Sequence, residues 1–374
     1  MNSNISLVDG SKLIVESLAR SGVEAFVSYP ITPANWINQY ASKRFPLMTF
    51  APDEITVAQW IAGLSAAGKL PATATSFPGF ALMVESLNMS FMMELPMIII
   101  LTQRLGPSTG SATVGAQGDL MLVNSIISGG YNLPVFSTSN IYDCWSVTEK
   151  AVHTAVKLRT PVVLLTSKEM IMTSRSMDIS KLNSIKKVEY DFYTDETAYI
   201  PYQANSQLVP PFLPVTNNQH QVRLNSSTHD ETGTIKKATK AALGNTIRLH
   251  TKVQRRLNEY LLYEFDEDEN NELLIISYDI SAEATRDAIK LLREKGIKVS
   301  SLFPKTIIPF SKDLLEIINN YKRVLIVEEN LSGLLAKIIY GINPPANVFK
   351  VNKIGSMITP NEIIKEAERC LQIY

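Results

Sequence analysis

Two charged residues stand beside predicted strand ends, where an α/β sheet usually binds its ligands. Glu54 begins an amphipathic helix directly after Pro52 and Asp53, and Arg104 follows the apolar strand Met97–Thr102. In open parallel sheets the ligand lies in the crevice at the carboxyl ends of the strands. An arginine there, beside glycines and hydroxyl groups, can bind a carboxylate or a phosphate with two parallel hydrogen bonds.

Each of these residues also has a purely structural interpretation. A carboxylate in the first turn of a helix complements the helix dipole, and Arg104 could form a surface salt bridge. The sequence contains no GxGxxG motif, no Walker loop and no His/Cys cluster with metal-ligand spacing. His229, in His229-Asp230-Glu231, is interpreted as a loop or interface feature. The spacing of the residues leaves these alternatives open.

Composition restricts the possible classes of protein. A chain of 374 residues with 45% hydrophobic residues favours two packed domains. The chain has 36 Lys and Arg residues in total and 36 Asp and Glu residues. This balance of charge argues against nucleic acid or an anionic membrane as the main partner. We expect no signal peptide, and the apolar stretch Met97–Leu101 is too short to span a bilayer. Cys144 and Cys370 are expected to be free buried thiols in the cytoplasm, too few to hold an iron–sulfur cluster.

The periodicity predicts helices that alternate with short apolar strands, hence a parallel sheet with helices on both faces. In the first half, helices are expected at Gly10–Ser21, Glu54 to about Lys69, a segment through Met93, and Val147–Lys157. Strands are expected at Glu24–Ser28, Ala72–Ser76, Met97–Thr102 and Val162–Thr166, with a Phe77-Pro78-Gly79 turn after the second.

The second half begins with a segment, about 186–233, in which periodicity fades and prolines are frequent. A charged helix is then expected over Thr234–Phe265. The alternation resumes with strands at Leu273–Ser277, Val299–Phe303 and Val324–Glu328 and a helix at Ala282–Lys295. We therefore expect a first domain at 1–185, a linker at 186–233 and a smaller α/β domain at 234–374.

Several motifs occur in order at the spacing of a known family, and together they resemble the alpha subunit of 2-oxoacid:ferredoxin oxidoreductases. The resemblance covers nearly the whole chain. It rests on Tyr29-Pro30-Ile31-Thr32-Pro33, Asp53-Glu54, Thr75-Ser76-Phe77-Pro78-Gly79-Phe80-Ala81-Leu82-Met83, Gln103-Arg104, Gly106-Pro107-Ser108-Thr109-Gly110, Gln117-Gly118-Asp119-Leu120, His229-Asp230-Glu231-Thr232-Gly233 and Val327-Glu328-Glu329-Asn330.

The resemblance implies a pyrimidine-binding domain of a thiamine-diphosphate enzyme, followed by a transketolase C-terminal-like domain. It assigns Glu54 to N1′ of the aminopyrimidine, where a carboxylate stabilises the imino tautomer. Thr32 and Arg104 are implied to hold the substrate carboxylate, with Ser108 and Thr109 also on the substrate side. The remaining cofactor contacts are expected from Tyr29, Pro30, Ile31, Gly79 and Phe80.

The resemblance also implies partners. The chain has no Gly-Asp-Gly segment for magnesium and diphosphate and no cluster cysteines. In this family both Mg²⁺ and the [4Fe-4S] cluster belong to the beta subunit, so the thiamine diphosphate would be shared with that subunit. A separate gamma subunit, possibly a delta subunit, ferredoxin, CoA and a 2-oxoacid complete the expected assembly. Phe77, Trp36 and the uncharged loop Ser111–Ala116 depart from the usual family pattern.

The expected activity is CoA-dependent oxidative decarboxylation of a 2-oxoacid, with 2-oxoglutarate favoured over pyruvate and branched-chain oxoacids. Two alternatives remain open on the sequence. One is a non-catalytic paralogue that serves as a scaffold subunit. The other is the beta-type subunit of a lipoamide-linked oxoacid dehydrogenase, whose domains are similar.

Overall fold

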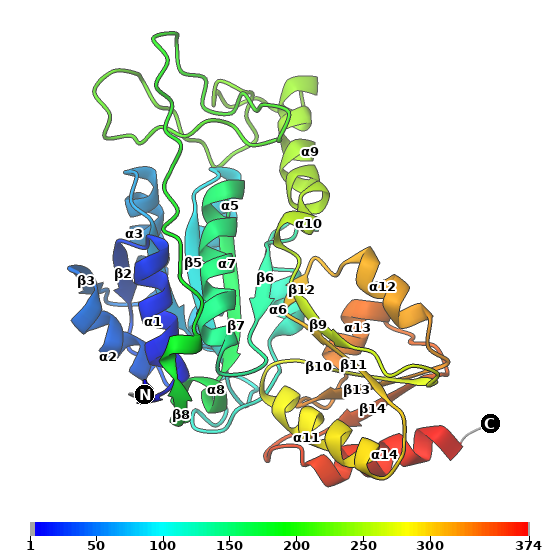
Figure 1. The fold of residues 1–374 in the computed structure, drawn as a ribbon. Coiled ribbons are helices and arrows are strands. Elements are labelled where there is room, and N and C mark those ends of the chain that lie inside the picture. Colours follow the sequence, from blue (N-terminus) through cyan, green and yellow to red (C-terminus); the bar gives the residue numbers. More distant parts are fainter. Residues whose placement is uncertain (1–3, 373–374) are drawn as a thin grey trace.

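The computed structural model describes residues 4–372 and contains two α/β units side by side (Figure 1). The first is built on a seven-stranded sheet with the order β12-β6-β7-β5-β4-β2-β3, parallel except that β12 runs antiparallel to β6. Its strands are β2 (Ala25–Ser28), β3 (Leu47–Phe50), β4 (Pro71–Thr75), β5 (Met97–Gln103), β6 (Val135–Ser137), β7 (Pro161–Ser167) and β12 (Thr306–Ile308).

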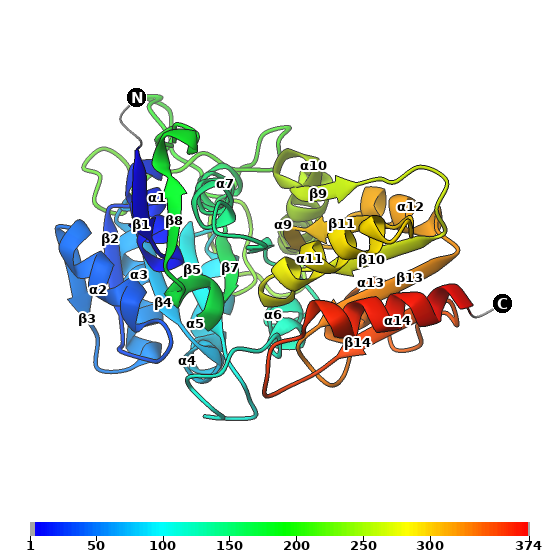
Figure 2. The same ribbon diagram turned by 60° about the horizontal axis from the view of Figure 1, so that its bottom comes forward.

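Alternation along the strands divides the apolar side chains between the two faces of this sheet. In β5, Ile98 and Ile100 pack with helices α1 and α7, whereas Ile99 and Leu101 pack with α3 and α5. The helices of the first unit are α1 (Gly10–Ser21), α2 (Asn35–Arg44), α3 (Glu54–Ala66), α4 (Phe77–Leu82), α5 (Val84–Met92), α6 (Leu120–Asn124), α7 (Asp143–Leu158) and α8 (Lys168–Met172). A small antiparallel pair, β1 (Ile5–Val8) and β8 (Arg175–Asp178), lies beside them and is followed by the 3-10 turn Ile179–Lys181 (Figure 2).

The second unit has a five-stranded sheet with the order β14-β13-β10-β11-β9, in which only β9 is antiparallel to its neighbour. Helices α11 and α14 cover one face of it, as Figure 2 shows. The elements are β9 (Tyr263–Asp266), β10 (Leu273–Ser277), α11 (Ile280–Glu294), β11 (Ser300–Pro304), α12 (Lys312–Asn319), β13 (Arg323–Glu328), α13 (Leu334–Tyr340), β14 (Val348–Asn352) and α14 (Pro360–Gln372).

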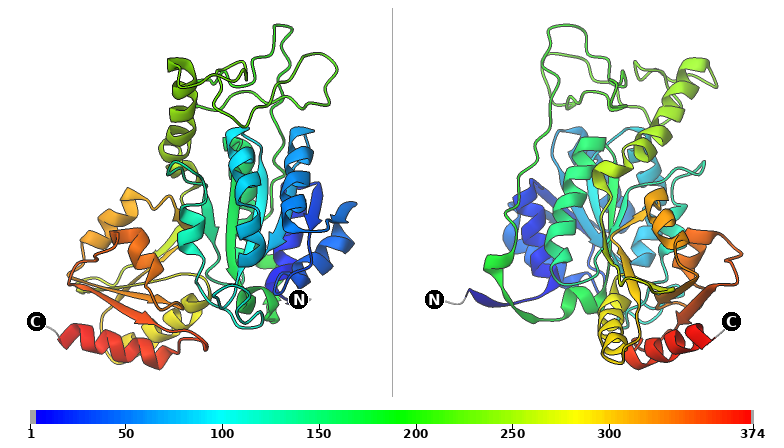
Figure 3. Two further views of the ribbon diagram at one scale, coloured as in Figure 1. Left: turned by 180° about the vertical axis from the view of Figure 1, so that it is seen from behind. Right: turned by 45° about the vertical axis from the view of Figure 1, so that its right-hand side comes forward.

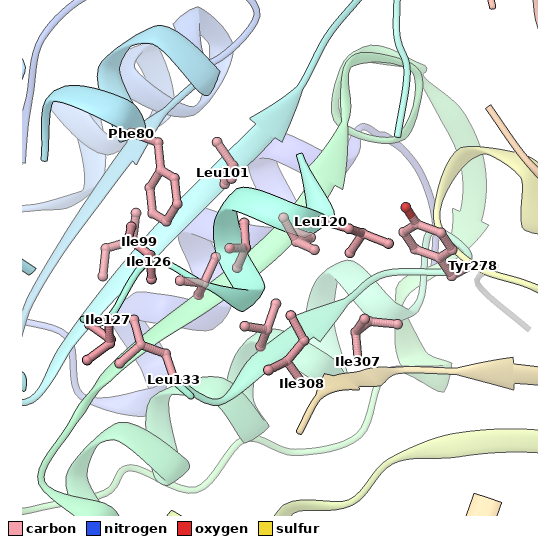
Figure 4. Packing of buried hydrophobic residues seen from close by; sticks show 14 of the residues in the cluster. Phe80, Ile99, Leu101, Leu120, Ile126, Ile127, Leu133, Tyr278, Ile307 and Ile308 are labelled. Atoms are coloured by element: carbon pink, nitrogen blue, oxygen red, sulfur yellow. The ribbon is translucent and has the colours of Figure 1, made fainter. Parts of the chain in front are cut away.

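The two units share a hydrophobic core. The chain leaves the second sheet after β11, and β12 then pairs with β6 at the edge of the first sheet. Ile307 and Ile308 of β12 and Tyr278 from the end of β10 pack in one cluster with Leu120 and Leu133 of the first unit (Figure 4). This continuous packing fixes the second unit against the first, beside the loops that follow β5.

Most predicted elements are present, but two predictions are wrong. The single helix expected over Thr234–Phe265 is α9 (Lys240–Arg255) and the short α10 (Leu257–Tyr260), followed by strand β9. Thr239 caps α9, and the backbone turns extended at Leu261, after which β11 provides a ladder of hydrogen bonds. Phe77-Pro78-Gly79 is the first turn of α4 rather than a separate turn, because proline is well tolerated at the start of a helix.

The predicted irregular segment is confirmed: from Leu182 to Thr239 the structure has neither helix nor strand. It starts near β8 and runs along α1, and its loops then lie at the end of the first sheet opposite α8, together with α9 (Figures 1 and 3). A buried cluster anchors α9 there, since Arg248 and Lys252 each lie 2.5 Å from a carboxylate oxygen of Glu94. Burial raises the pKa of Glu94, but the two cations outweigh that effect and hold it at about 2.

No helix among residues 4–372 combines the length and the apolar character that crossing a membrane requires.

Candidate active site

Glu54 lies at the carboxyl edge of the first sheet, where α3 begins. Asp53 is the N-cap residue, and its side chain accepts a hydrogen bond of 2.7 Å from the backbone N–H of Thr56. Capping is therefore performed by Asp53 and leaves the Glu54 carboxylate free for another role. The Glu54 residue is only 6% exposed and forms no salt bridge with any described residue. Burial, assisted by the charge of Asp53, raises the pKa of Glu54.

A glycine makes room for this carboxylate. Gly79, in the first turn of α4, lies directly against Glu54, so that a Cβ atom added there would be 2.5 Å from Glu54 Oε1 and closer still to Thr75 Oγ1. Thr75 is the last residue of β4, and its carbonyl accepts a hydrogen bond of 2.8 Å from Thr102 Oγ1 of β5. The end of β4, from which α4 continues, is thus hydrogen-bonded to β5, and Gly79 of α4 packs directly against Glu54.

Replacing Gly79 with alanine should displace the Glu54 carboxylate. If Glu54 contacts thiamine diphosphate, as the resemblance implies, the assembled complex should then bind this cofactor at least about tenfold more weakly, measured by calorimetry. The matched control is Gly63→Ala in the middle of α3, where an added Cβ meets no atom within 4 Å. Alanine at a helix interior stabilises by about 1 kcal/mol relative to glycine, so this control should bind the cofactor normally. Equal cofactor affinity in both variants would show that Gly79 does not shape the site.

Arg104 does not form, with any described residue, the surface salt bridge that was its structural alternative. The residue is 6% exposed, and its Nη1 donates a hydrogen bond of 2.5 Å to the carbonyl oxygen of Thr32. Its side chain therefore reaches from the end of β5, across β4, to the loop that follows β2. Nε of Arg104 is buried and has no hydrogen-bond partner among residues 4–372. Burial lowers the pKa of Arg104, although a guanidinium remains charged in ordinary conditions.

The loop after β2 carries the other predicted contact residues. Thr32 is half-buried, and its Oγ1 accepts a hydrogen bond of 3.0 Å from Asn35 Nδ2. Tyr29 and Pro30 are exposed beside it, whereas Ile31 packs against the core formed by α1 and α2. The structure thus brings Arg104 into contact with the backbone of Thr32, and their shared assignment stays a prediction.

Three residues that were predicted to contact the substrate or the cofactor are not placed for a direct side-chain contact. Ser108 and Thr109 are exposed at the tip of a tight loop closed by a 2.8 Å hydrogen bond from Leu105 N–H to the Val114 carbonyl. Phe80 is fully buried, and Figure 4 shows its ring against Ile99 and Leu101 in the core. The assignments of these three residues remain predictions.

Sequence reasoning assigned no role to a set of buried polar residues next to Arg104. Gln103 donates a 3.3 Å hydrogen bond from Nε2 to Asp279 Oδ2 and accepts one of 3.4 Å from the N–H of Asp119. Gln117 donates from Nε2 to the Tyr278 carbonyl at 2.7 Å. These contacts fasten the loop after β5 to the second unit. The motif Gln117-Gly118-Asp119 was the available signal, but burial is not visible in a motif.

The other polar features are structural. His229 is buried between the Ser227 carbonyl, 2.7 Å from Nδ1, and Asn245, 2.9 Å from Nε2. Cys144 and Cys370 are free and buried, as predicted. Within residues 4–372 no group of three or more His, Cys, Asp or Glu side chains is arranged to hold a metal ion.

The fold, a parallel sheet with helices on both faces beside a smaller α/β unit, is that of a thiamine-diphosphate-binding family. Residues 16–245 match the family described as pyruvate flavodoxin/ferredoxin oxidoreductase, thiamine diphosphate binding, and residues 271–363 match pyruvate:ferredoxin oxidoreductase core domain II. Because the first match covers more than half of the chain, the chain belongs to the pyruvate flavodoxin/ferredoxin oxidoreductase family. The resemblance drawn from the motifs and the fold class are both confirmed.

Individual relatives match over nearly the full chain. The 2-oxoglutarate synthase subunit KorA of Methanocaldococcus jannaschii is 27% identical over 97% of this chain and 99% of its own length. The ketoisovalerate oxidoreductase subunit VorB of Methanothermobacter thermautotrophicus is 26% identical, with 93% of each chain covered. The structure of a 2-oxoglutarate:ferredoxin oxidoreductase from Magnetococcus marinus superposes with a TM-score of 0.93 at 26% identity, and covers 99% of this chain and 66% of that one.

Proposed function

We propose that this chain is the alpha subunit of a 2-oxoacid:ferredoxin oxidoreductase with 2-oxoglutarate as the favoured substrate. The reaction joins the decarboxylated acyl group to CoA, releases carbon dioxide and passes two electrons to ferredoxin. The observation that carries the proposal is the buried carboxylate of Glu54, which forms no salt bridge with any described residue and lies against Gly79 at the edge where Arg104 meets Thr32. Neither the scaffold subunit nor the lipoamide-linked dehydrogenase is favoured by the family to which the chain belongs.

The residues at this edge fit the aminopyrimidine half of thiamine diphosphate. Glu54 would accept a hydrogen bond from N1′, and its raised pKa suits a carboxyl group that shares a proton with a ring nitrogen. Gly79 lets the Glu54 carboxylate lie close to α4, and Tyr29, Pro30 and Ile31 are the further side-chain contacts we propose. Phe80, whose side chain is fully buried in the core, would contribute through its backbone. When bound, thiamine diphosphate supplies the carbon nucleophile that attacks the 2-oxo group and takes up the electron pair left by carbon dioxide.

Arg104 and Thr32 are the proposed clamp for the substrate carboxylate. The hydrogen bond from Arg104 to the Thr32 carbonyl fixes the guanidinium plane and uses only one of its donors. A clamp of this kind acts through positioning, because it sets the bond that will break against the cofactor. Ser108 and Thr109 would meet the substrate if their loop closes over it.

The site needs a second chain to be complete. We propose a beta subunit that carries the diphosphate site with Mg²⁺ and the [4Fe-4S] cluster, together with a separate gamma subunit and possibly a delta subunit. Exposed apolar side chains surround the edge of the site: Tyr29, Phe50, Ile55, Leu82 and Met121. A group of this kind on a protein surface often marks an interface, and its position beside Glu54 suits a partner that closes the site.

Purification of the native complex followed by an assay of dye or ferredoxin reduction tests the function. We expect CoA-dependent reduction with 2-oxoglutarate and smaller rates with pyruvate and branched-chain 2-oxoacids. A higher kcat/KM for pyruvate or a branched-chain oxoacid would correct the substrate only. The absence of reduction with every 2-oxoacid would contradict the proposed function.

A further inference from the structure

Asp119 is a buried carboxyl group that no structural role explains. It stands at the N-cap of the five-residue helix α6, yet its side chain makes no capping hydrogen bond. The residue is 4% exposed, and its Oδ2 has no hydrogen-bond partner in the part of the chain that the structure describes. A buried polar atom left unpaired costs about 1–3 kcal/mol, so a role at the site is a reasonable explanation for its presence.

The charged group that most affects Asp119 is Arg104. Each side chain shifts the pKa of the other, but no salt bridge within 4 Å joins them, and Arg104 Nε is unpaired as well. The backbone fixes this arrangement, because the N–H of Asp119 is bound to the side chain of Gln103, the residue before Arg104. Arg104 is therefore within electrostatic reach of one carboxyl group of the protein and, in the proposed function, binds a carboxylate of the substrate.

We propose that Asp119 is a positioning residue that keeps its proton when the oxoacid carboxylate occupies Arg104. A guanidinium that meets one anion binds it well, whereas two carboxylates around a single cation in a buried site repel each other. Protonated Asp119 leaves the whole charge of Arg104 to the substrate. Ionised Asp119 competes with the substrate for that charge. This inference rests on the proposed function, because it takes the clamp role of Arg104 as its starting point.

The charge state of Asp119 can change in the neutral range. Burial raises its pKa to about 7, and the attraction of Arg104 only partly opposes that shift. Tyr278, a buried phenol whose pKa burial raises well above its usual value, also feels the charge of Asp119, and Asp279 is linked to Asp119 through Gln103. Helix α13, which packs against α6, carries Lys337 and Tyr340. Burial raises the pKa of Asp279 to about 8. Burial also raises the pKa of Glu329, which lies beyond Gln117, to about 7.

Substrate affinity should consequently fall as pH rises. Below pH 7 Asp119 already carries its proton, and affinity is constant. Above pH 7 a proton must be taken up with the substrate, so log KM rises with pH with a slope of up to one. Between pH 6.5 and 8.5 we expect KM for the oxoacid to rise about tenfold, with a much smaller change in kcat.

The test measures KM for the preferred oxoacid and Ki for oxamate across pH in the assembled complex. Oxamate carries the same carboxylate next to a carbonyl but cannot lose it as carbon dioxide, so its Ki reports binding alone. Asp119→Asn mimics the protonated side chain and should give flat profiles. The control is Asp279→Asn, since Asp279 also titrates near neutrality but bonds to Thr138 and Gln103 rather than facing Arg104, and it should retain the slope.

A slope in KM and Ki that persists in Asp119→Asn would overturn the inference. So would flat profiles in the wild type. If Asp119→Asn does not assemble, Asp119→Ser provides the same reading. A complex whose wild-type form turns over no 2-oxoacid would instead contradict the proposed function, and with it this inference, so the two failures are distinguishable.

Discussion

Replacing Glu54 with glutamine should lower kcat of the assembled complex by roughly 10²–10⁴-fold, the range of general acid–base effects. Glutamine is nearly isosteric, so it fits beside Gly79, but a neutral amide cannot form the charge-assisted hydrogen bond in which a carboxylate accepts the proton of N1′–H. The fold should be unaffected, because Asp53 rather than Glu54 caps α3. The measurement is dye reduction at saturating oxoacid and CoA, with thermal unfolding measured on the same samples.

The structural alternative for Glu54, its interaction with the helix dipole, has its own control. Glu85 is likewise an acidic residue in the first turn of a helix, α5, but its side chain is exposed. Glu85→Gln should reproduce any dipole effect, typically 0.3–1 kcal/mol, without loss of activity. A Glu54→Gln complex that keeps more than a tenth of the wild-type kcat would remove Glu54 from its assigned role.

Replacing Arg104 with lysine should reduce kcat/KM for several 2-oxoacids by roughly ten- to a hundredfold, because a hydrogen bond to a charged group contributes about 1.5–3 kcal/mol. Lysine keeps the positive charge but loses the planar fork that binds a carboxylate through two parallel bonds. It also loses the donor that Arg104 directs at the Thr32 carbonyl. Thiamine diphosphate affinity should change little, which separates a substrate clamp from a cofactor contact.

Two other outcomes would assign Arg104 differently. A loss confined to 2-oxoglutarate, with pyruvate spared, would mean that Arg104 binds the distal carboxylate. A lower unfolding temperature with normal kinetics would mean a structural role. Arg248→Lys is the matched control for the latter, because Arg248 binds Glu94 through Nη1 and Nη2 far from the site and should affect stability alone.

The elements that periodicity defines strongly could be predicted from the sequence. The helix Gly10–Ser21 and the strand Leu273–Ser277 were predicted with their observed bounds. The apolar residues of the helix recur at helical spacing, and the strand is a short continuous apolar run. The edge strands could not be predicted. Strand β9 continues a helical pattern, and β12 has three residues and pairs with a strand more than 160 positions earlier. Such pairing depends on tertiary contacts rather than on local preference.

The candidate site shows the same division. Glu54 and Arg104 could be predicted because a charged residue beside a strand end is visible in the sequence. Two other features depend on how neighbouring strands align. One is the packing of Gly79 against the Glu54 carboxylate, and the other is the contact between Arg104 and the Thr32 carbonyl. Sequence reasoning assigned Asp119 no role beyond its place in the motif Gln117-Gly118-Asp119-Leu120. Its burial and its missing capping bond are visible only in the structure.

The central claim is that this chain provides half of a thiamine-diphosphate site. Calorimetric titration of thiamine diphosphate with Mg²⁺ into the isolated chain and into the chain assembled with its beta subunit tests this most directly. We expect weak binding to the isolated chain and tight, magnesium-dependent binding to the assembled pair. Tight, magnesium-dependent binding by this chain alone would contradict the shared site.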